Sequence, residues 1–520
     1  MNLVNHLSER AQQHPHRVAL IDSEQSMTYG ELYEHVCGAS ASLRAQGLGR
    51  GDTVLILQPV DIPLYISLLG AFHAGLTVMF IDPSAGKAMM RNSLTLHQPD
   101  AFIGTGKAHI LRLMVPGIRR IKHHFHSTGW VPFSTTWNPA PSGFEEPQET
   151  PPDSPALITF TSGSTGIPKA ACRTHGFLLA QHKALAESLD YIEVEVDMVT
   201  LPIFTLANLA SGLTSVLADT DLRFPARADS PAILAQCEKH NVTRCAASPA
   251  FFTRLHHDGM MPGFKAIYTG GAPVFPNLLD EIQSANPEMD VVTVFGSTEA
   301  EPIAHIAWKN VSNEDHQTML DGKGLLVGKT VRATQLKIIP DQTGKHIPAM
   351  TEDELGTMTL PSGEVGEIIV TGDHVLKGYL HGKGDKENKV QAGDNTWHRT
   401  GDAAWIDDSG RVWLVGRCSA AIHKAGKTIY PFGIECSAMC HANLQRCALI
   451  EHDGKITLIV EGDADENMRK ELLDKLAPMS VECIRFLQTI PVDKRHNAKI
   501  DYPLLETRLG KHCQVIDHSL

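Results

Sequence analysis

One segment in the first third of the chain has the residue types of a loop that binds a polyphosphate. A β-branched, apolar run over residues 157–160 is followed by hydroxyl and glycine residues and then by a lysine. Glycines let the backbone bring its N–H groups close to an anion, while the hydroxyls add donors and the lysine adds a positive charge. The spacing is not that of the Walker loop. A flexible Ser/Gly linker is the alternative, which the strand pattern before the loop disfavours. The expected phosphate ligands are Thr161, Ser162, Gly163, Ser164, Thr165, Gly166 and Lys169.

This loop resembles the phosphate-binding signature of the acyl-adenylate-forming superfamily, and the resemblance continues in order to the C-terminus over nearly the whole chain. The superfamily contains acyl-CoA synthetases, adenylation domains of peptide synthetases, firefly luciferase and olefin-pathway β-lactone synthetases. Residues 204–210, 297–302 and 495–499 are most similar to its fatty-acid-CoA-ligase-like branch, which includes the β-lactone synthetases. The resemblance implies that the chain activates a carboxylic acid with ATP and Mg²⁺ through an acyl-AMP intermediate.

Three further segments match superfamily motifs that contact adenine and ribose. Gly271, Ala272 and Pro273 follow a strand pattern, and their small size would let a flat base approach the backbone. Asp402 lies in a Thr-Gly-Asp motif and is expected to accept hydrogen bonds from the ribose hydroxyls, as acidic residues do in other nucleotide sites. Arg417 matches an arginine that also contacts the ribose. Considered singly, these residues also fit a common turn and two solvated surface charges.

Residues 295–299 resemble the aromatic-Gly-x-Thr-Glu motif of the superfamily and lie about 130 residues after the phosphate loop. Thr298 is expected to donate to the α-phosphate. Glu299 is expected to bind Mg²⁺, a cation that prefers carboxylate and phosphate oxygens. The alternative is a turn at a strand end with a solvated glutamate. The residues expected to contact the nucleotide, with the aromatic ring stacked on adenine, are Phe295, Gly296 and Ser297.

Lys499 is the expected catalytic lysine of adenylation, because residues 491–500 resemble the segment in which the superfamily keeps this lysine. Attack of a carboxylate on the α-phosphate builds negative charge on phosphoryl oxygens, and a positioned ammonium offsets that charge. Thr298 and Glu299 are the other residues expected to act in catalysis. By itself a lysine near a C-terminus is a solvated charge, and only the resemblance raises Lys499 above that interpretation.

Residues 201–209 resemble the segment beside the acyl pocket, and Phe204, Thr205 and Asn208 are the expected pocket residues. Many acyl-CoA synthetases have His directly after the Phe, where this chain has Thr205. The apolar residues around them favour an aliphatic acid, although a plain core helix fits the same pattern. We find no Asp anchored to a matching motif that could pair with an α-ammonium group, which argues against an α-amino acid.

The acceptor of the acyl group is the least defined part of the prediction. Residues 424–427 are similar to the glycine loop that closes over the pantetheine of CoA, so an acid–CoA ligase is the leading hypothesis. Ser419 departs from the Asp or Lys that the superfamily often has at its hinge. The alternatives are an acyl-AMP ligase that loads a carrier protein and a β-lactone synthetase that acts on a β-hydroxy acid without CoA. A luciferase-type monooxygenase and a nucleotide-binding protein without catalysis are two further hypotheses.

Alternating helical and strand patterns must position these residues. In the first hundred residues and again over residues 176–293, they predict α/β layers around a largely parallel sheet. Residues 320–415 show short β runs separated by Gly, Asp and Pro, which predicts a β-rich subdomain. We expect a large N-terminal adenylation domain over residues 1–415. A small, mobile α+β domain over residues 416–520 is expected to carry Lys499, with ATP bound between the two.

Length and composition narrow the class of protein. A chain of 520 residues is too long for one ordinary core, so two or more domains are expected. The net charge of −13 argues against a nucleic-acid partner. The N-terminus lacks the features of a signal peptide, and the most apolar stretch, residues 64–80, is short for a membrane span. We expect a cytoplasmic protein without a transmembrane segment, whose partner is a small carboxylic acid.

Overall fold

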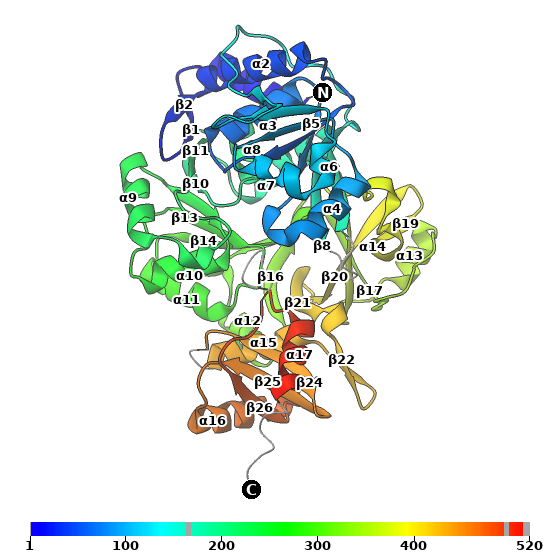
Figure 1. The fold of residues 1–520 in the computed structure, drawn as a ribbon. Helices are drawn as coiled ribbons and strands as arrows, with labels where there is room; N and C mark the ends of the chain where they lie inside the picture. The colour runs from blue at the N-terminus through cyan, green and yellow to red at the C-terminus, as the bar shows by residue number, and fades with distance from the viewer. Residues whose placement is uncertain (1, 163–167, 442–443, 493–498, 513–520) are drawn as a thin grey trace.

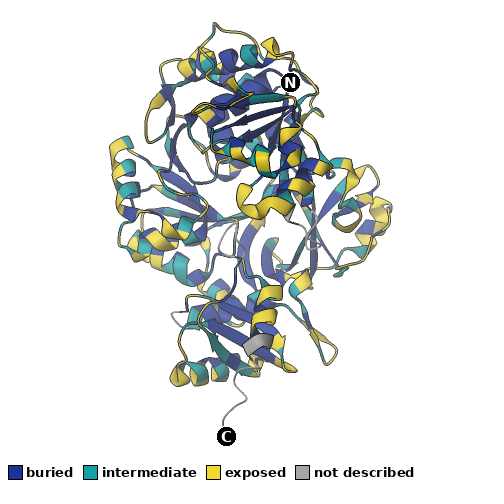
Figure 2. Ribbon diagram, in the orientation of Figure 1, coloured by how far each residue is buried: buried dark blue, intermediate teal, exposed yellow. Residues whose placement is uncertain are grey.

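The computed structural model describes residues 2–162, 168–441, 444–492 and 499–512, and Figure 1 shows their arrangement. The chain forms two large sheets, a three-stranded sheet near the C-terminus and a two-stranded hairpin, with helices packed around them. Most strands of the large sheets are buried, and the helices expose their outer faces (Figure 2). The predicted α/β class, with a β-rich part and a small C-terminal domain, is confirmed.

A seven-stranded sheet forms one layer of the N-terminal part, in the order β7-β6-β5-β3-β4-β8-β9. All of its pairings are parallel except the antiparallel pair β8–β9. Parallel neighbours need a crossover, which helix α3 provides between β3 and β4. Asp61 caps this helix by accepting a hydrogen bond from the backbone N–H of Leu64. The elements are β3 Thr53–Leu57, α3 Ile62–His73, β4 Thr77–Phe80, β5 Ala101–Gly104, β6 His123–His126, β7 Thr135–Thr136, β8 Pro155–Ser162 and β9 Pro168–Thr174.

A fourteen-stranded sheet runs through the rest of the N-terminal part, in the order β17-β18-β20-β21-β16-β15-β14-β13-β12-β10-β11-β1-β2, with β19 paired to β20. Pairings from β11 to β14 are parallel, and those from β14 to β17 are antiparallel. The strands are β1 Val18–Ile21, β2 Ser26–Thr28, β10 Val196–Val199, β11 Thr214–Leu217, β12 Arg244–Ala247, β13 Ala266–Gly270, β14 Asp290–Ser297, β15 Ala300–Ala307, β16 Leu325–Thr330, β17 Gln335–Ile339, β18 Gly366–Thr371, β19 Lys389–Ala392, β20 Asn395–Ile406 and β21 Arg411–Arg417.

Helices cover the parallel strands and form the cores with them. Buried side chains of α9, α10 and α11 pack with those of β12, β13 and β14 in one apolar cluster, and these helices lie at the side of the sheet in Figure 1. A second cluster joins α1, α2 and α3 to the seven-stranded sheet. The helices of the N-terminal part are α1 Val4–Gln13, α2 Tyr29–Ala45, α4 Gly86–Leu96, α5 Leu111–Met114, α6 Pro116–Arg119, α7 His175–Ser188, α8 Phe204–Ser211, α9 Ser230–His240, α10 Pro249–His257, α11 Pro276–Ala285, α12 Asn313–Leu320, α13 Glu352–Met358 and α14 Asp385–Asn388.

The C-terminal residues form a domain with its own sheet, β24-β25-β26, and its own apolar core. It lies below the N-terminal part in Figure 1. Helix α15 joins the two parts, because the Ser437 hydroxyl donates to the Leu320 carbonyl at the end of α12 over 2.6 Å. A Cβ atom on Gly433 would lie 2.2 Å from the Gly322 carbonyl oxygen, so glycine permits this close approach. The elements are β22 Ile422–Lys424, β23 Lys427–Ile429, α15 Pro431–His441, β24 Cys447–His452, β25 Lys455–Glu461, α16 Glu466–Leu476, β26 Cys483–Leu487 and α17 Tyr502–His512.

The division of the chain at residue 415 falls inside strand β21, which continues to Arg417. Strand β21 belongs to the large sheet, and the separate sheet of the C-terminal domain begins only at β24. The exact boundary and the mobility of the C-terminal domain therefore stay predictions. Among the helices of the described residues, none is both long and apolar enough to cross a bilayer.

Candidate active site

The predicted phosphate loop lies at the tip of the β8–β9 hairpin. Backbone pairing of Thr161 with Lys169 and of Ser162 with Pro168 brings the two ends of the loop together. Its central residues, Gly163, Ser164, Thr165 and Gly166, lie outside the described residues. The Lys169 ammonium donates to Asn388 Oδ1 over 3.0 Å and lies 5.7 Å from the centre of the Tyr379 ring. Burial lowers the pKa of Lys169.

Glu299 lies in the turn between β14 and β15, where its carboxylate accepts a hydrogen bond from the Tyr379 hydroxyl over 2.7 Å. Burial acts to raise the pKa of Glu299, but His398, the Tyr379 bond and the Lys389 ammonium lower it further than burial raises it. The carboxylate is therefore ionised at neutral pH. An ionised carboxylate is the oxygen donor that Mg²⁺ prefers, so this residue fits a magnesium ligand.

The buried residue Lys389 favours the ionised form of the Glu299 carboxylate through its positive charge. Lys389 donates to the Leu376 carbonyl, lies 3.3 Å from His398 Nδ1 and lies 5.4 Å from the centre of the Tyr379 ring. Burial lowers the pKa of Lys389 to about 7 and that of His398 to about 3. Lys389 stands in a mostly polar stretch, residues 386–391, so no local pattern marks it, and the residues that it contacts come from other elements.

Asp402 and Arg417, the predicted ribose-binding residues, occupy paired positions on neighbouring strands β20 and β21. The Arg417 guanidinium donates to Asp402 Oδ1 over 2.8 Å and to the Thr400 carbonyl over 3.2 Å. The Asp402 side chain is largely buried, whereas that of Arg417 is about half exposed, at 49%. The antiparallel register thus brings together two residues that are fifteen positions apart in the sequence.

A cavity of about 370 Å³ opens where the ends of β13 and β14 meet helix α8. Two residues predicted to act in catalysis, Lys499 and Thr298, both line it, although Lys499 comes from the C-terminal domain. The predicted nucleotide-binding and acyl-pocket residues that line it are Phe204, Gly271, Ala272, Gly296 and Ser297. Pro273 and Phe295 are half-buried nearby and are not among its lining residues, and the Phe295 ring packs against the apolar core of the large sheet.

Two glycines shape this cavity for different reasons. A Cβ atom on Gly270 would lie 2.2 Å from the Val294 carbonyl oxygen, so glycine is needed for β13 to approach β14. Gly271 has a φ of +80°, which favours glycine, and a Cβ atom there would have no described atom within 4 Å. The space above Gly271 is therefore open to a flat group.

The other two predicted acyl-pocket residues are held in the cavity wall rather than at its surface. The Thr205 hydroxyl donates to the Tyr65 hydroxyl over 2.9 Å, and Tyr65 donates to the Pro202 carbonyl over 3.0 Å. The Asn208 amide donates to Asp197 Oδ2 over 2.7 Å and to the Ser215 hydroxyl over 3.1 Å. Thr205 and Asn208 are fully buried, and neither lines the cavity of the described residues.

Arg173 and Glu301 line the cavity and were not singled out in the sequence. Arg173 is buried and donates to Thr159 Oγ1 over 3.1 Å and to the Thr298 carbonyl over 2.8 Å. Burial raises the pKa of the Glu301 carboxyl, against the opposing effect of Arg173 and Lys499. Glu301 stands two positions beyond Glu299, and side chains two positions apart in a strand lie on the same face. This spacing was the sequence signal that could have indicated Glu301.

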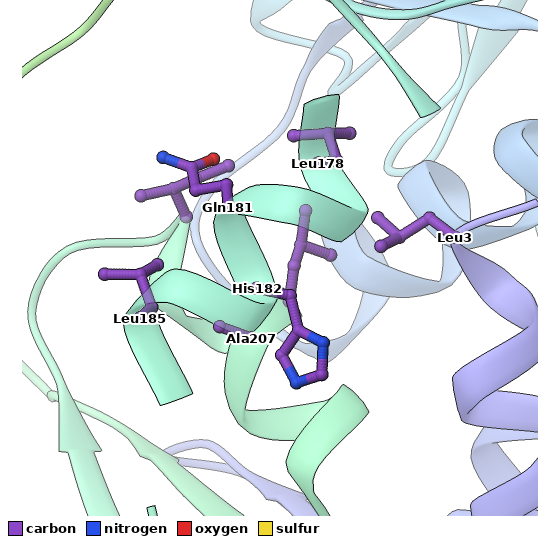
Figure 3. Close-up of a pocket in the computed structure, with 8 residues that line it drawn as sticks. Leu3, Leu178, Gln181, His182, Leu185 and Ala207 are labelled. Carbon is purple, nitrogen blue, oxygen red and sulfur yellow. The ribbon is translucent and has the colours of Figure 1, made fainter. Parts of the chain in front are cut away.

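A second cavity lies between α7 and α8, beside the N-terminal residue Leu3 (Figure 3). It measures about 10 Å³, which is room for about one water molecule. His182, one of its lining residues, has its Nε2 atom 2.8 Å from the Ser211 hydroxyl, and burial lowers its pKa to about 4. The cavity is too small for a substrate, so the larger cavity is the candidate site.

Comparison with known proteins agrees with this geometry. A family model described as AMP-binding enzyme matches residues 7–380. An olefin β-lactone synthetase from Xanthomonas campestris pv. campestris is 28% identical over 91% of this chain and 89% of its own length. A 2-succinylbenzoate–CoA ligase from Bacillus licheniformis is 25% identical over 94% and 97%.

The solved structures point to the same fold. The crystal structure of the anthranilate CoA ligase AuaEII in complex with anthranoyl-AMP superposes with a TM-score of 0.82 at 17% identity, covering 99% of this chain and 98% of that one. The family model spans more than half of this chain, and both relatives cover nearly all of it. The chain belongs to the AMP-binding enzyme family, a family of adenylate-forming enzymes.

Proposed function

We propose that this protein uses ATP to convert an aliphatic carboxylic acid into an acyl-AMP, with release of pyrophosphate. The observation that carries the proposal is the meeting of Lys499 and Thr298 at one cavity whose inner wall is largely apolar. Apolar lining residues, among them Leu64, Leu68, Phe80 and Leu206, suit an alkyl chain. The pair Asp402–Arg417 is proposed to hold the ribose, and Lys169 the phosphates.

In the proposed reaction, a carboxylate oxygen of the acid bonds to the α-phosphorus, and the bond from that phosphorus to the bridging oxygen of pyrophosphate breaks. The Lys499 ammonium offsets the negative charge that develops on the phosphoryl oxygens. Thr298 donates a hydrogen bond to the α-phosphate. Glu299 is the proposed Mg²⁺ ligand, and the bound ion would neutralise part of the charge on the phosphates.

We propose CoA as the acceptor in the second step, in which its thiol sulfur bonds to the acyl carbon and AMP leaves. The similarity to a 2-succinylbenzoate–CoA ligase and the β22–β23 hairpin support this choice. The hairpin turns at Ala425 and Gly426. Lys427, which ends the turn, is an exposed basic residue suited to an anionic cofactor.

The φ angles at this turn are +50° for Ala425 and +75° for Gly426, so both residues adopt the left-handed conformation that a two-residue hairpin turn requires. The Lys424 ammonium donates to the Gly454 carbonyl over 2.8 Å and pairs with Glu482, which fixes the hairpin to the C-terminal domain. The loop is therefore presented by the same domain that supplies Lys499.

A second candidate is β-lactone formation from a β-hydroxy acid, and the Glu301 carboxylate in the cavity favours it. In this reaction the hydroxyl oxygen of the acyl-AMP bonds to the acyl carbon, the bond from that carbon to the AMP oxygen breaks, and the hydroxyl loses its proton. The Glu301 carboxylate could accept a hydrogen bond from this hydroxyl and then its proton. The similarity to the olefin β-lactone synthetase from Xanthomonas campestris also supports this candidate.

One experiment separates the two candidates. The protein is incubated with ATP, Mg²⁺ and either a straight-chain acid or its 3-hydroxy analogue, with and without CoA, and the products are identified by mass spectrometry. We expect pyrophosphate release with both acids and an acyl-CoA only when CoA is present. A lactone formed from the hydroxy acid without CoA would instead establish the second candidate, and no pyrophosphate release with any acid would contradict both.

A further inference from the structure

Four large apolar side chains are exposed close together in the sequence, between residues 110 and 133. The exposed fractions are 54% for Ile110, 85% for Leu113, 83% for Trp130 and 92% for Phe133. We call these four residues the 110–133 patch. Single exposed apolar residues are common on soluble domains, but two aromatic rings and two aliphatic chains exposed in one short segment mark an interaction surface.

The patch is held together by hydrogen bonds between its two halves. Arg112, in helix α5, donates from Nη1 to the Pro132 carbonyl over 3.0 Å and from Nη2 to the Phe133 carbonyl over 3.5 Å. The helical half therefore lies beside the loop that follows strand β6. Val131, between the exposed aromatic residues, is buried, so the loop is anchored while Trp130 and Phe133 point outward.

The segment that carries the patch is strongly basic, in contrast to the whole protein. Residues 101–144 contain no Asp or Glu, whereas the complete chain has a net charge of −13. Arg119, Arg120 and Lys122 are exposed, as is Lys107. The five basic residues of the segment are Lys107, Arg112, Arg119, Arg120 and Lys122.

We propose that the 110–133 patch docks this enzyme onto the surface of an anionic lipid bilayer. Trp130, Phe133 and Leu113 would enter the boundary between headgroups and acyl chains, where aromatic and aliphatic side chains gain most from burial. The basic residues would attract the anionic headgroups over about one Debye length. The basic segment is complementary in charge to an anionic bilayer, whereas the rest of this acidic protein would be repelled by one. This local charge selects an anionic lipid surface as the partner. The proposal does not depend on which acid the enzyme activates.

Vesicle sedimentation tests the proposal. The full-length protein is mixed with phosphatidylcholine vesicles that contain or lack phosphatidylserine, and the bound fraction is measured after centrifugation. We expect binding to the anionic vesicles only, with a bound fraction that falls as salt is added. The double substitution Trp130→Ser/Phe133→Ser should weaken partitioning about tenfold or more. Absence of binding to anionic vesicles, or equal binding by this variant, would overturn the proposal.

Two further variants make the result specific. Ile192→Ser/Val194→Ser removes two side chains that are 60% and 65% exposed elsewhere on the surface, and this matched control should bind like the wild type. Arg119→Gln/Arg120→Gln/Lys122→Gln should lose most of the difference between anionic and neutral vesicles. Light scattering without lipid tests whether the patch instead binds a second copy of the chain. A dimer that the Trp130→Ser/Phe133→Ser substitution dissociates would establish this alternative and overturn the proposal.

Discussion

At the scale of single residues, two cationic side chains line the candidate cavity, and their positions decide which of them can act on the phosphoryl oxygens in the proposed reaction. Lys499 and Arg173 both line the cavity, yet they have different surroundings. Arg173 is committed to Thr159 and to the Thr298 carbonyl, so it shapes the wall beside the reacting atoms. Lys499 is exposed and comes from the other domain, which suits a cation that acts in one step only.

Replacing Lys499 by Ala should separate catalysis from binding. The ammonium offsets charge that develops mainly in the transition state, so acyl-AMP formation should fall by about a hundredfold or more. ATP affinity should change little, because Lys169, Asp402 and Arg417 remain. Stopped-flow adenylation and ATP titration by calorimetry measure the two effects. As a control, synthetic acyl-AMP should still react with CoA. Adenylation at the wild-type rate in the variant would assign Lys499 to a solvated surface charge.

Lys389 should make stability depend on pH above neutrality. Burial lowers its pKa to about 7 in the folded state, from an ordinary value of 10.5. Between these values the unfolded chain holds one more proton on this residue, so this group makes folding more favourable as the pH rises from about 7 to about 10. The slope is at most about 1.4 kcal/mol per pH unit.

Denaturant unfolding at several pH values checks this dependence. Lys389→Met should remove the Lys389 contribution, so the free energy of unfolding of the wild type should rise relative to that of the variant across this window. Lys386 is exposed, and the control Lys386→Met should leave the wild-type profile unchanged. Parallel profiles for the wild type and Lys389→Met would contradict a lowered pKa at this position.

At the scale of elements, the site depends on the ends of β13 and β14. The two strands are parallel neighbours, so their carboxyl ends reach the same edge of the sheet. Strand β15 then returns antiparallel to β14, and the turn between them carries Thr298 and Glu299. A change in the spacing of these strands moves both residues at once.

Gly270→Ala should disturb this spacing. The added Cβ atom would lie 2.2 Å from the Val294 carbonyl oxygen, a backbone atom that moves only with its strand. We expect a loss of stability of about 1–3 kcal/mol, as for other overpacked positions, together with slower adenylation. Gly49→Ala is the matched control, because no described atom lies within 4 Å of its Cβ position. Thermal unfolding should show little difference for Gly49→Ala, and equal unfolding midpoints for the two variants would refute the steric argument.

At the scale of the whole molecule, the contact between the domains is the feature to test. Helix α15 of the C-terminal domain packs against α12 and β21, through Ser437 and the close approach of Gly433 to Gly322. If the C-terminal domain is mobile, as the sequence predicts, and rotates between the two half-reactions, this contact has to open or slide.

Hydrogen exchange can detect such a rotation. Peptides covering residues 313–324 and 431–441 should exchange faster when acyl-AMP and a non-reactive CoA analogue are bound than with ATP alone. Peptides from β12 and β13 in the sheet core serve as the internal control and should not change. Identical exchange of the contact peptides in both states would show that the domain keeps a single position.

The family and the order of its motifs could be predicted from the sequence alone. The motifs are short local patterns in a fixed order, and such patterns can be recognised without knowing how the chain packs. They are the phosphate loop, the segment ending in Glu299, the residues Asp402 and Arg417, and Lys499. The α/β class followed from alternating helical and strand periods, which depend only on neighbouring residues. The predicted β-rich part appears as the antiparallel half of the large sheet.

Only the tertiary structure decided which side chains share the cavity. Thr205 and Asn208 stand beside Phe204 in the sequence, yet hydrogen bonds to Tyr65 and Asp197 hold them in the wall. Arg173 and Glu301 both line the cavity although they are more than 100 positions apart in the sequence, and Arg173 donates to the Thr298 carbonyl across that separation. The direction of a side chain is set by its helix face or strand register and by its packed neighbours, and those neighbours come from segments that a local pattern does not contain.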